Sequence, residues 1–290
     1  MASAAASAAA LVEAAKKAAA ARAVAEHLLP THRHVGIGSG STVVHVVDAI
    51  AAQGPAFWEN MTFYPTGSQS KGLIRAAGLR LCHLDERPVV PETGRLVALD
   101  VAFDGADEVD DELNCIKGGG ACLLQEKLVA VAAKKFVVVA DYRKLSPRLC
   151  TKWKAIPIEV LPMAAPDVVD RLTSLGSLQP TVRPGVPGKA GEVVTDNGMW
   201  IIDAPFPPLL LDKDLASAGI TTGRDADGNW GVSALADELL RIPGIVEVGL
   251  FYGLNGVQAA ALGKTGLAQK PVAAYFGMED GSVQTKVAEQ

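Results

Sequence analysis

Hydrophobic and polar positions follow two different rhythms along the first half of the chain. Short apolar runs, which predict strands, occur at HRHVGIG, NMTFYP, LRLCHL, GRLVALDVAFDGAD and KFVVVAD. Stretches with the spacing of amphipathic helices lie between them, at STVVHVVDAIAAQG, at SQSKGLIRAAG and from about residue 121 onward. Strands that alternate with helices predict βαβ units, a mainly parallel sheet and helices on both of its faces. The near-continuous apolar strands fit burial on both faces.

The pattern changes after residue 154. Prolines become frequent, DVVDRLTSLG predicts a helix, and residues 180–206 predict two strands around turns, with Asp196-Asn197-Gly198 as a hairpin signal. IPGIVEVGLFYG, at residues 242–253, predicts a return to a buried strand. We therefore predict a Rossmann-like three-layer α/β domain with a mainly parallel sheet, formed by residues 1–154 with 240–290. Residues 155–239 are expected to form a smaller α+β domain.

The composition is that of an ordinary globular protein, with 290 residues, 49% hydrophobic and 20% charged. The formal net charge of −5 provides no basic footprint for nucleic acid. No apolar run approaches the ~18 residues that a membrane-spanning helix needs, so we predict a soluble intracellular protein with no membrane partner. The four cysteines form no C-x-x-C pair, which favours free thiols over a regulatory disulfide.

The N-terminal segment is rich in alanine and predicts a helix from about residue 11 to 29, ended by Pro30. Its first ten residues contain only Met, Ala and Ser, as in an organelle transit peptide, although Glu13 comes early and the first arginine is Arg22. These ten residues are expected to be a frayed extension or a processing remnant. The compartment is accordingly predicted as the chloroplast stroma or the cytoplasm.

The loop GIGSGST, residues 36–42, lies between a predicted strand and a predicted helix, where a parallel sheet presents its ligand-binding edge. Gly40 and its neighbouring glycines let backbone amides approach an anion, and the following helix offers its positive N-terminus. The hydroxyls of Ser39, Ser41 and Thr42 add donors. The loop lacks the ending of a P-loop and the glycine spacing of a dinucleotide fingerprint. We predict a site for the phosphate of a small molecule, and a tight turn with a Ser or Thr N-cap is the alternative.

A second candidate site is the acidic stretch FDGADEVDDE. Asp104 and Asp107 follow an apolar strand and are expected at its C-terminal rim. Two carboxylates there suit hydrogen bonds to sugar hydroxyls, proton transfer, or a divalent metal. The other four acids, Glu108, Asp110, Asp111 and Glu112, predict a solvated turn.

A third candidate site begins with a cation and three glycines, Lys117, Gly118, Gly119 and Gly120. A helix that starts near residue 121 would spread Gln125, Glu126 and Lys127 over roughly 200° of its surface, so at least one of them must face inward. An inward carboxylate is desolvated, which raises its pKa and makes it a usable base near neutral pH. The lysine and the bare amides in front of it suit an oxyanion. A glutamate at the helix edge, paired with a lysine, is the alternative.

Taken in order and with their spacing, GIGSGST, FDGADEVD, KGGGACLLQEKLVA and ADYRKL resemble the motifs of A-type ribose-5-phosphate isomerases. VVTDNGMWIID and IPGIVEVGLF extend the resemblance to about residue 251. The family implies interconversion of D-ribose 5-phosphate and D-ribulose 5-phosphate through an enediolate, without metal or organic cofactor. It also implies a homodimer, and a place in the pentose phosphate pathway or, in a plastid, the reductive pentose phosphate cycle.

By motif, the resemblance places the catalytic base at Glu126 and the catalytic-site lysine at Lys117. Asp104 is expected to transfer the proton that opens the sugar ring, and Asp107 to order the hydroxyls. Lys117 and the three glycine amides would stabilise the enediolate that forms when Glu126 removes the C2 proton. Substrate binding is implied for a further set: Ser39, Gly40, Ser41, Thr42, Lys144 and an N-terminal lysine, either Lys16 or Lys17.

The chain departs from the family pattern in three places, none of which removes a proposed catalytic group. Ser39 replaces the common threonine, Gln125 stands where an arginine or another residue is often found, and the tail after residue 251 is longer than in short bacterial members. Three other functions stay open at this point. They are an amino-sugar-phosphate isomerase or deaminase, a non-catalytic sugar-phosphate regulator, and a coenzyme A transferase with Glu126 as nucleophile.

Overall fold

The computed structural model describes residues 2–185, 189–264, 266 and 268–288. By packing, the chain divides into two compact units. Unit 1 comprises Met1–Gly105, Gln125–Tyr142 and Leu254–Gln290, and unit 2 comprises Ala106–Leu124 and Arg143–Gly253. Unit 2 thus includes residues 106–124, 143–154 and 240–253, all of which are predicted above to belong to the larger domain. The domain boundaries proposed there stay a prediction.

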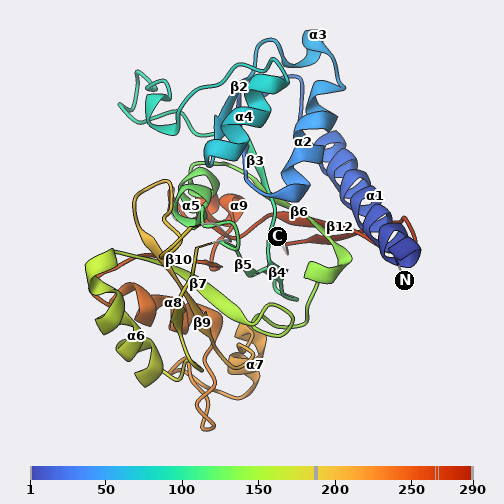
Figure 1. The fold of residues 1–290 in the computed structure, drawn as a ribbon. Helices are drawn as coiled ribbons and strands as arrows, with labels where there is room; N and C mark the ends of the chain where they lie inside the picture. Colours follow the sequence, from blue (N-terminus) through green and yellow to red (C-terminus); the bar gives the residue numbers. More distant parts are fainter. Residues whose placement is uncertain (1, 186–188, 265, 267, 289–290) are drawn as a thin grey trace. The chain divides into compact units, whose positions relative to one another are not determined.

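Unit 1 is built on a six-stranded sheet with the order β13-β12-β6-β3-β1-β2 (Figure 1). Its strands are β1 (His34–Ile37), β2 (Thr62–Pro65), β3 (Val101–Asp104), β6 (Phe136–Asp141), β12 (Ala273–Gly277) and β13 (Val283–Val287). Every pairing is parallel except that of β12 with β13. The mainly parallel sheet confirms the predicted Rossmann-like fold class.

Helices cover both faces of this sheet. They are α1 (Ala2–His27), α2 (Ser41–Ala51), α3 (Pro55–Trp58), α4 (Ser68–Ala76), α5 (Leu123–Val131) and α9 (Gly256–Ala261). Alternate strand residues such as Val35 and Phe103 join α1, α2 and α4 in one apolar core. On the opposite face, Gly36 lies so close to Val129 of α5 that a Cβ atom there would be 2.6 Å from its Cγ1 atom. The three layers expected from the sequence are therefore present.

Three predicted elements differ from the structure in extent. Residues 79–84 do not form a continuous strand; they contribute one isolated bridge, from Leu81 to Phe63. The long strand predicted at 94–107 shortens to β3, because residues 96 and 99 form only isolated bridges and the chain turns after Asp104. The N-terminal helix, predicted from about residue 11, begins at Ala2, as the high helix propensity of alanine favours.

Unit 2 contains two antiparallel sheets. The larger has the order β10-β7-β9-β8, with β7 (Ala155–Val160), β8 (Thr181–Val182), β9 (Trp200–Pro205) and β10 (Ile245–Val248). The smaller has the order β11-β5-β4, with β4 (Glu108–Val109), β5 (Cys115–Ile116) and β11 (Leu250–Phe251). Three helices, α6 (Ala165–Ser174), α7 (Asp212–Ser217) and α8 (Val232–Leu240), complete a unit of α+β type. The hairpin signal is confirmed, since Gly198 adopts a φ of 76° between bridged residues 194 and 200.

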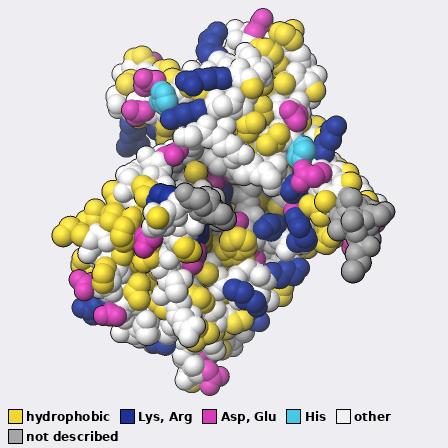
Figure 2. Space-filling model, viewed as in Figure 1, with side chains coloured by type: hydrophobic (Ala, Val, Ile, Leu, Met, Phe, Trp, Pro, Cys, Tyr) yellow, Lys and Arg dark blue, Asp and Glu magenta, His cyan; other side chains and the backbone are white. Residues whose placement is uncertain are grey.

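Hydrophobic side chains are exposed over the region of α6 in unit 2 (Figure 2). Met163, Leu178 and Leu161 are 84%, 61% and 40% exposed. Within the part of the chain that the structure describes, no helix combines the length and the apolarity needed to cross a bilayer.

Candidate active site

In unit 1, the loop after β1 turns directly into α2. Gly40 occupies the N-cap of α2 with a φ of 108°, so Ser41 and Thr42 lie in the first turn of the helix. The alternative interpretation, in which a Ser or Thr side chain caps this helix, is wrong at the N-cap, because a glycine stands there and no side-chain cap is formed. The first turn of α2 therefore presents hydroxyls and N–H groups, which is the arrangement that anions bind.

Two hydroxyls of this loop contact polar side chains from other elements. The Lys16 Nζ of α1 donates to the Ser41 Oγ at 3.0 Å, and the Ser39 Oγ lies 2.8 Å from the Thr66 Oγ1. Lys16 is buried and Lys17 is exposed, so the structure brings Lys16, of the two lysines left open by the sequence, to the loop.

Glu13 holds Lys16 in place. Its Oε1 lies 2.6 Å from the Lys16 Nζ, and its Oε2 lies 3.0 Å from the His45 Nε2. Hydrogen bonds from Lys16 and His45 lower the pKa of Glu13 below its ordinary value. The ammonium group of Lys16 is thus fixed beside Ser41 by a carboxylate that stays charged.

Asp104 ends β3 and is 3% exposed. Its Oδ1 accepts the N–H of Ser39 at 3.0 Å and the N–H of Gly105 at 2.7 Å. Gly38 makes this approach possible, because a Cβ atom at that position would lie 1.9 Å from the Asp104 Oδ1. The predicted place of Asp104, at the C-terminal end of its strand, is confirmed.

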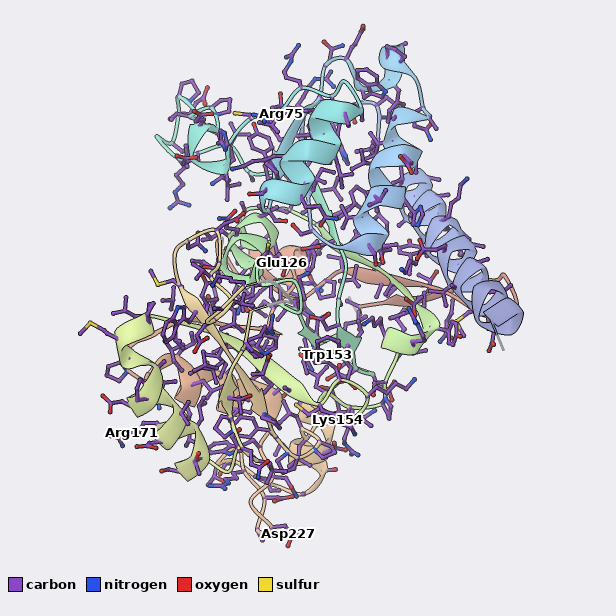
Figure 3. All side chains as sticks on the ribbon, in the orientation of Figure 1. Arg75, Glu126, Trp153, Lys154, Arg171 and Asp227 are labelled. Atoms are coloured by element: carbon purple, nitrogen blue, oxygen red, sulfur yellow. The ribbon has the colours of Figure 1, made fainter. Side chains whose placement is uncertain are left out.

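Glu126 lies on α5 (Figure 3) and is 6% exposed. Its neighbour Lys127 is 5% exposed, while Gln125 is half-buried. The expectation that at least one of the three polar residues faces inward is therefore confirmed. The helix begins at Leu123, two residues later than predicted, because Ala121 adopts a left-handed φ of 59°.

In unit 2, Lys117 and the three glycines after it form the loop that follows β5 in the chain. Lys117 is 2% exposed, and its Nζ lies 5.5 Å from the centroid of the Phe251 ring. Gly118 has a φ of 105°, and the N–H of Gly119 donates to the Asp107 Oδ2 at 2.7 Å. Asp107 and the glycine loop, predicted as separate motifs, are thus in direct contact.

Lys144 and Arg183 are two further cationic side chains of unit 2. The Lys144 Nζ, at the end of a 3-10 turn, lies 4.9 Å from the centroid of the Trp153 ring. Arg183, which the sequence analysis does not single out, donates from its Nη1 to the carbonyl oxygens of Gly118 and Gly119 at 3.1 and 3.0 Å. No local motif marks Arg183, since its partners lie 65 and 64 residues away in the chain.

The solvated acidic turn predicted after Asp107 is wrong for three of its four members. Glu108 and Asp110 are fully buried, and Glu112 is half-buried. Backbone N–H groups compensate the burial: Glu108 accepts from Thr151 and Lys152, and Asp110 accepts from Glu112 and Asn114. Glu112 accepts from residues 212 and 213, so only Asp111 is exposed as predicted.

Potential metal ligands do not gather in the described residues, where no group of three or more His, Cys, Asp or Glu side chains could hold an ion. The four cysteines are all free thiols, as expected.

Comparison with known proteins identifies the family. The model of ribose 5-phosphate isomerase A (phosphoriboisomerase A) matches residues 62–265. The ribose-5-phosphate isomerase of Mycosarcoma maydis is 45% identical over 267 residues, which cover 92% of this chain and 78% of the relative. The chain belongs to the ribose 5-phosphate isomerase A family.

Other members of the isomerase family show the same likeness. The enzyme of Schizosaccharomyces pombe is 44% identical, with 92% of this chain and 80% of the relative covered. A solved D-ribose-5-phosphate isomerase in complex with phospho-erythronic acid is 31% identical and superposes with a TM-score of 0.73, covering 95% of this chain and 99% of that one. The prediction of an aldose–ketose isomerase acting on ribose 5-phosphate is confirmed, and the three other functions left open are not favoured.

Proposed function

We propose that this isomerase interconverts D-ribose 5-phosphate and D-ribulose 5-phosphate with Glu126 as its general base. The observation that carries the proposal is the burial of Glu126, which is 6% exposed on a helix that begins three residues after Gly120. Glu126 removes the proton from C2 of the open aldose, and an enediolate forms. The same carboxyl group returns the proton to C1, while the proton of the C2 hydroxyl passes to the C1 oxygen, which leaves the carbonyl at C2. A carboxylate withdrawn from water is a better base near neutral pH than an exposed one.

The phosphate is bound by the first turn of α2. Gly40, Ser41 and Thr42 provide N–H and hydroxyl donors there, and Lys16, 3.0 Å from the Ser41 Oγ, provides the cation. Ser39 supports the same loop through Thr66. Because the phosphate does not react, its binding energy is available to position C2 for the base.

Ring opening and charge stabilisation fall to the remaining groups. Asp104 transfers the proton that opens the furanose, Asp107 orders the sugar hydroxyls, and Lys144 binds the substrate. Lys117 and the amides of Gly118, Gly119 and Gly120 stabilise the enediolate. Since Asp107 already accepts the Gly119 N–H at 2.7 Å, that amide serves the oxyanion only by sharing its hydrogen, and Lys117 carries more of the charge.

We propose further that the reaction needs no metal or organic cofactor. Asp104 and Asp107, the pair considered as metal ligands, direct carboxylate oxygens at backbone N–H groups of the protein. The test is a ribose 5-phosphate isomerase assay after exhaustive EDTA treatment, with glucosamine 6-phosphate and an acyl-CoA as competing substrates. Unchanged turnover of ribose 5-phosphate supports the proposal; activity lost to EDTA and restored by Mg²⁺ or Mn²⁺ makes the aspartates metal ligands, and ammonia release from the amino sugar favours a deaminase.

A homodimer and a compartment complete the proposal. The exposed side chains Leu161, Met163 and Leu178 support a self-association surface on unit 2, which light scattering tests. The Ala- and Ser-rich first ten residues support the chloroplast stroma, while the early Glu13 supports the cytoplasm. The enzyme would serve the pentose phosphate pathway in either place and the reductive pentose phosphate cycle in a plastid. Imaging of a C-terminal fluorescent fusion decides between the compartments.

A further inference from the structure

The loop of Gly118, Gly119 and Gly120 has almost no side chains of its own to fix its shape. Gly118 adopts a φ of 105°, which glycine tolerates and other residues rarely adopt. A glycine run loses much conformational freedom when it is ordered, so its peptide groups need partners. One partner is local, because the Ala121 N–H donates to the Gly118 carbonyl at 3.0 Å. The carbonyl oxygens of Gly118 and Gly119 find one partner in common, the guanidinium of Arg183.

Arg183 is itself held rigidly. Its Nε and Nη2 donate to the two carboxylate oxygens of Asp203 at 2.8 and 2.5 Å. Its N–H donates to the carbonyl of Ile201 in β9, which extends the pairing of β8 with β9 by one residue. Its own carbonyl accepts the N–H of Val193, which precedes β9. Because β8 pairs with β9 through Thr181 and Asp203, residues 181, 183, 201 and 203 share one face of the sheet. The side chains of Arg183 and Asp203 are 15% and 30% exposed, so this ion pair is partly withdrawn from water.

Because the peptide bond is planar, hydrogen bonds from Arg183 to two carbonyl oxygens also fix the orientation of two N–H groups. In a trans peptide, the C=O of one residue and the N–H of the next point in opposite directions. Fixing the Gly118 oxygen therefore directs the Gly119 N–H, which donates to the Asp107 Oδ2 at 2.7 Å. Fixing the Gly119 oxygen likewise directs the Gly120 N–H away from the guanidinium.

We propose that Arg183 is a positioning residue of the isomerase, which orients the Gly119 and Gly120 amides and, through Gly119, the carboxylate of Asp107. It does not touch the substrate in this role. The geometry requires an arginine, because one planar guanidinium spans two successive carbonyls with Nη1 while its other edge pairs with a carboxylate. The three N–H donors of a lysine share one nitrogen, so a lysine cannot bind the two carbonyls and the carboxylate in this planar arrangement.

The test compares Arg183→Ala with Arg148→Ala, a matched control in the same unit. Arg148 also pairs with an aspartate, since its Nε and Nη2 lie 3.2 and 2.6 Å from the Asp214 Oδ2, but it is bonded to no glycine carbonyl of the loop. We expect Arg183→Ala to lower kcat by about 10- to 100-fold, the range for misplaced catalytic groups, with KM changed less than about threefold. Arg148→Ala should leave both constants near the wild-type values.

Three further measurements separate positioning from a general loss of fold. Millimolar methylguanidinium should restore part of the kcat of Arg183→Ala and do nothing for Arg148→Ala. Arg183→Lys should stay impaired although its charge is kept, and Asp203→Asn should lower kcat less than Arg183→Ala. A folded Arg183→Ala or Arg183→Lys enzyme with more than half of the wild-type kcat overturns the proposal, as does equal damage from Arg148→Ala.

The inference rests on the proposed role of the glycine loop and Lys117, so Lys117→Ala and Glu126→Gln are measured alongside. If these two variants remain active, the proposed mechanism has failed. If they are inactive while Arg183→Ala is fully active, only the role of Arg183 has failed.

Discussion

The two units fix their proposed functional groups in opposite ways. In unit 1, the proposed functional side chains are held largely by backbone: Asp104 accepts two N–H groups, and Ser41 and Thr42 are placed by the first turn of a helix. In unit 2, the proposed oxyanion loop is a stretch of backbone held by side chains, with Arg183 on its carbonyls and Asp107 on one of its amides. The unit 1 loop is recognisable from one continuous motif, although Lys16 and Asp104 reach it from elsewhere in the chain. The shape of the unit 2 loop depends on Arg183, whose partners lie 65 and 64 residues away in the chain.

The largest effect is expected for the base in unit 1. Glu126→Gln should lower kcat by about 10²- to 10⁴-fold and change KM much less, because it removes proton transfer and preserves size. Steady-state kinetics with ribose 5-phosphate measure both constants. Glu238→Gln, on a half-buried helical glutamate of α8, is the control and should behave as wild type. A Glu126→Gln enzyme that keeps over half of the wild-type kcat would sink the assignment.

The next effect concerns the phosphate loop. Ser41→Ala combined with Thr42→Ala should raise KM for ribose 5-phosphate by at least tenfold, since each hydroxyl bonded to a charged phosphate contributes about 1.5–3 kcal/mol. Much of this penalty should vanish with ribose, which lacks the phosphate. If these residues only stabilise the start of α2, the double variant loses about 1 kcal/mol of unfolding free energy, seen as a lower melting temperature, and its KM is unchanged. Ser174→Ala, at an exposed serine of α6, is the control for hydroxyl loss.

A smaller effect is expected from backbone crowding in unit 2. A Cβ atom on Gly119 would lie 2.6 Å from the Asp107 Oδ1, so Gly119→Ala must displace that carboxylate. We expect kcat to fall about tenfold or more, as for other displaced catalytic groups. Gly120→Ala should cost less, because a Cβ atom there meets nothing within 4 Å. Equal kinetics for the two variants would show that the contact between Asp107 and Gly119 does not matter.

The smallest expected effect is a difference between the two units in how their stability depends on pH. All five histidines lie in unit 1, and burial is the main cause that lowers the pKa of His27, His32 and His34. A histidine whose pKa is lower in the folded than in the unfolded state contributes fully to the stability of the fold above the unfolded pKa of about 6.5. As the pH falls below that value, the unfolded state binds the proton more readily and this contribution is lost. Hydrogen exchange between pH 7.5 and 5.0 should therefore show amides of unit 1 losing protection before those of unit 2. His27→Gln should weaken the trend, and equal loss in both units would contradict it.

Much of the fold could be predicted because the strands of the central sheet are apolar runs. β1, β2 and β6 lie within HRHVGIG, NMTFYP and KFVVVAD, and buried parallel strands require such runs. Strand ends were predicted less well. The run 79–84 has strand-like composition, yet it forms a single bridge, because extended pairing depends on a neighbour that the sequence does not specify.

The candidate site could be predicted where its residues are continuous in the chain. Residues 39–42 and 117–120 each lie within a few positions of one another, so a local motif is enough to propose them as candidates. The choice of Lys16 over Lys17 needed the helix phase of α1, set against a hydroxyl 25 residues away. The burial of Glu108 could not be foreseen, because its compensating N–H donors come from residues 151 and 152.

That buried carboxylate also bears on how the protein withstands oxidants. Cys150 immediately precedes the two residues that Glu108 binds. Burial, and then the negative charge of Glu108, raise the pKa of its thiol to about 12. Peroxides attack the thiolate rather than the thiol, so a cysteine kept protonated across the physiological range reacts slowly with them. The acid that anchors this turn thus also shields its sulfur from oxidation.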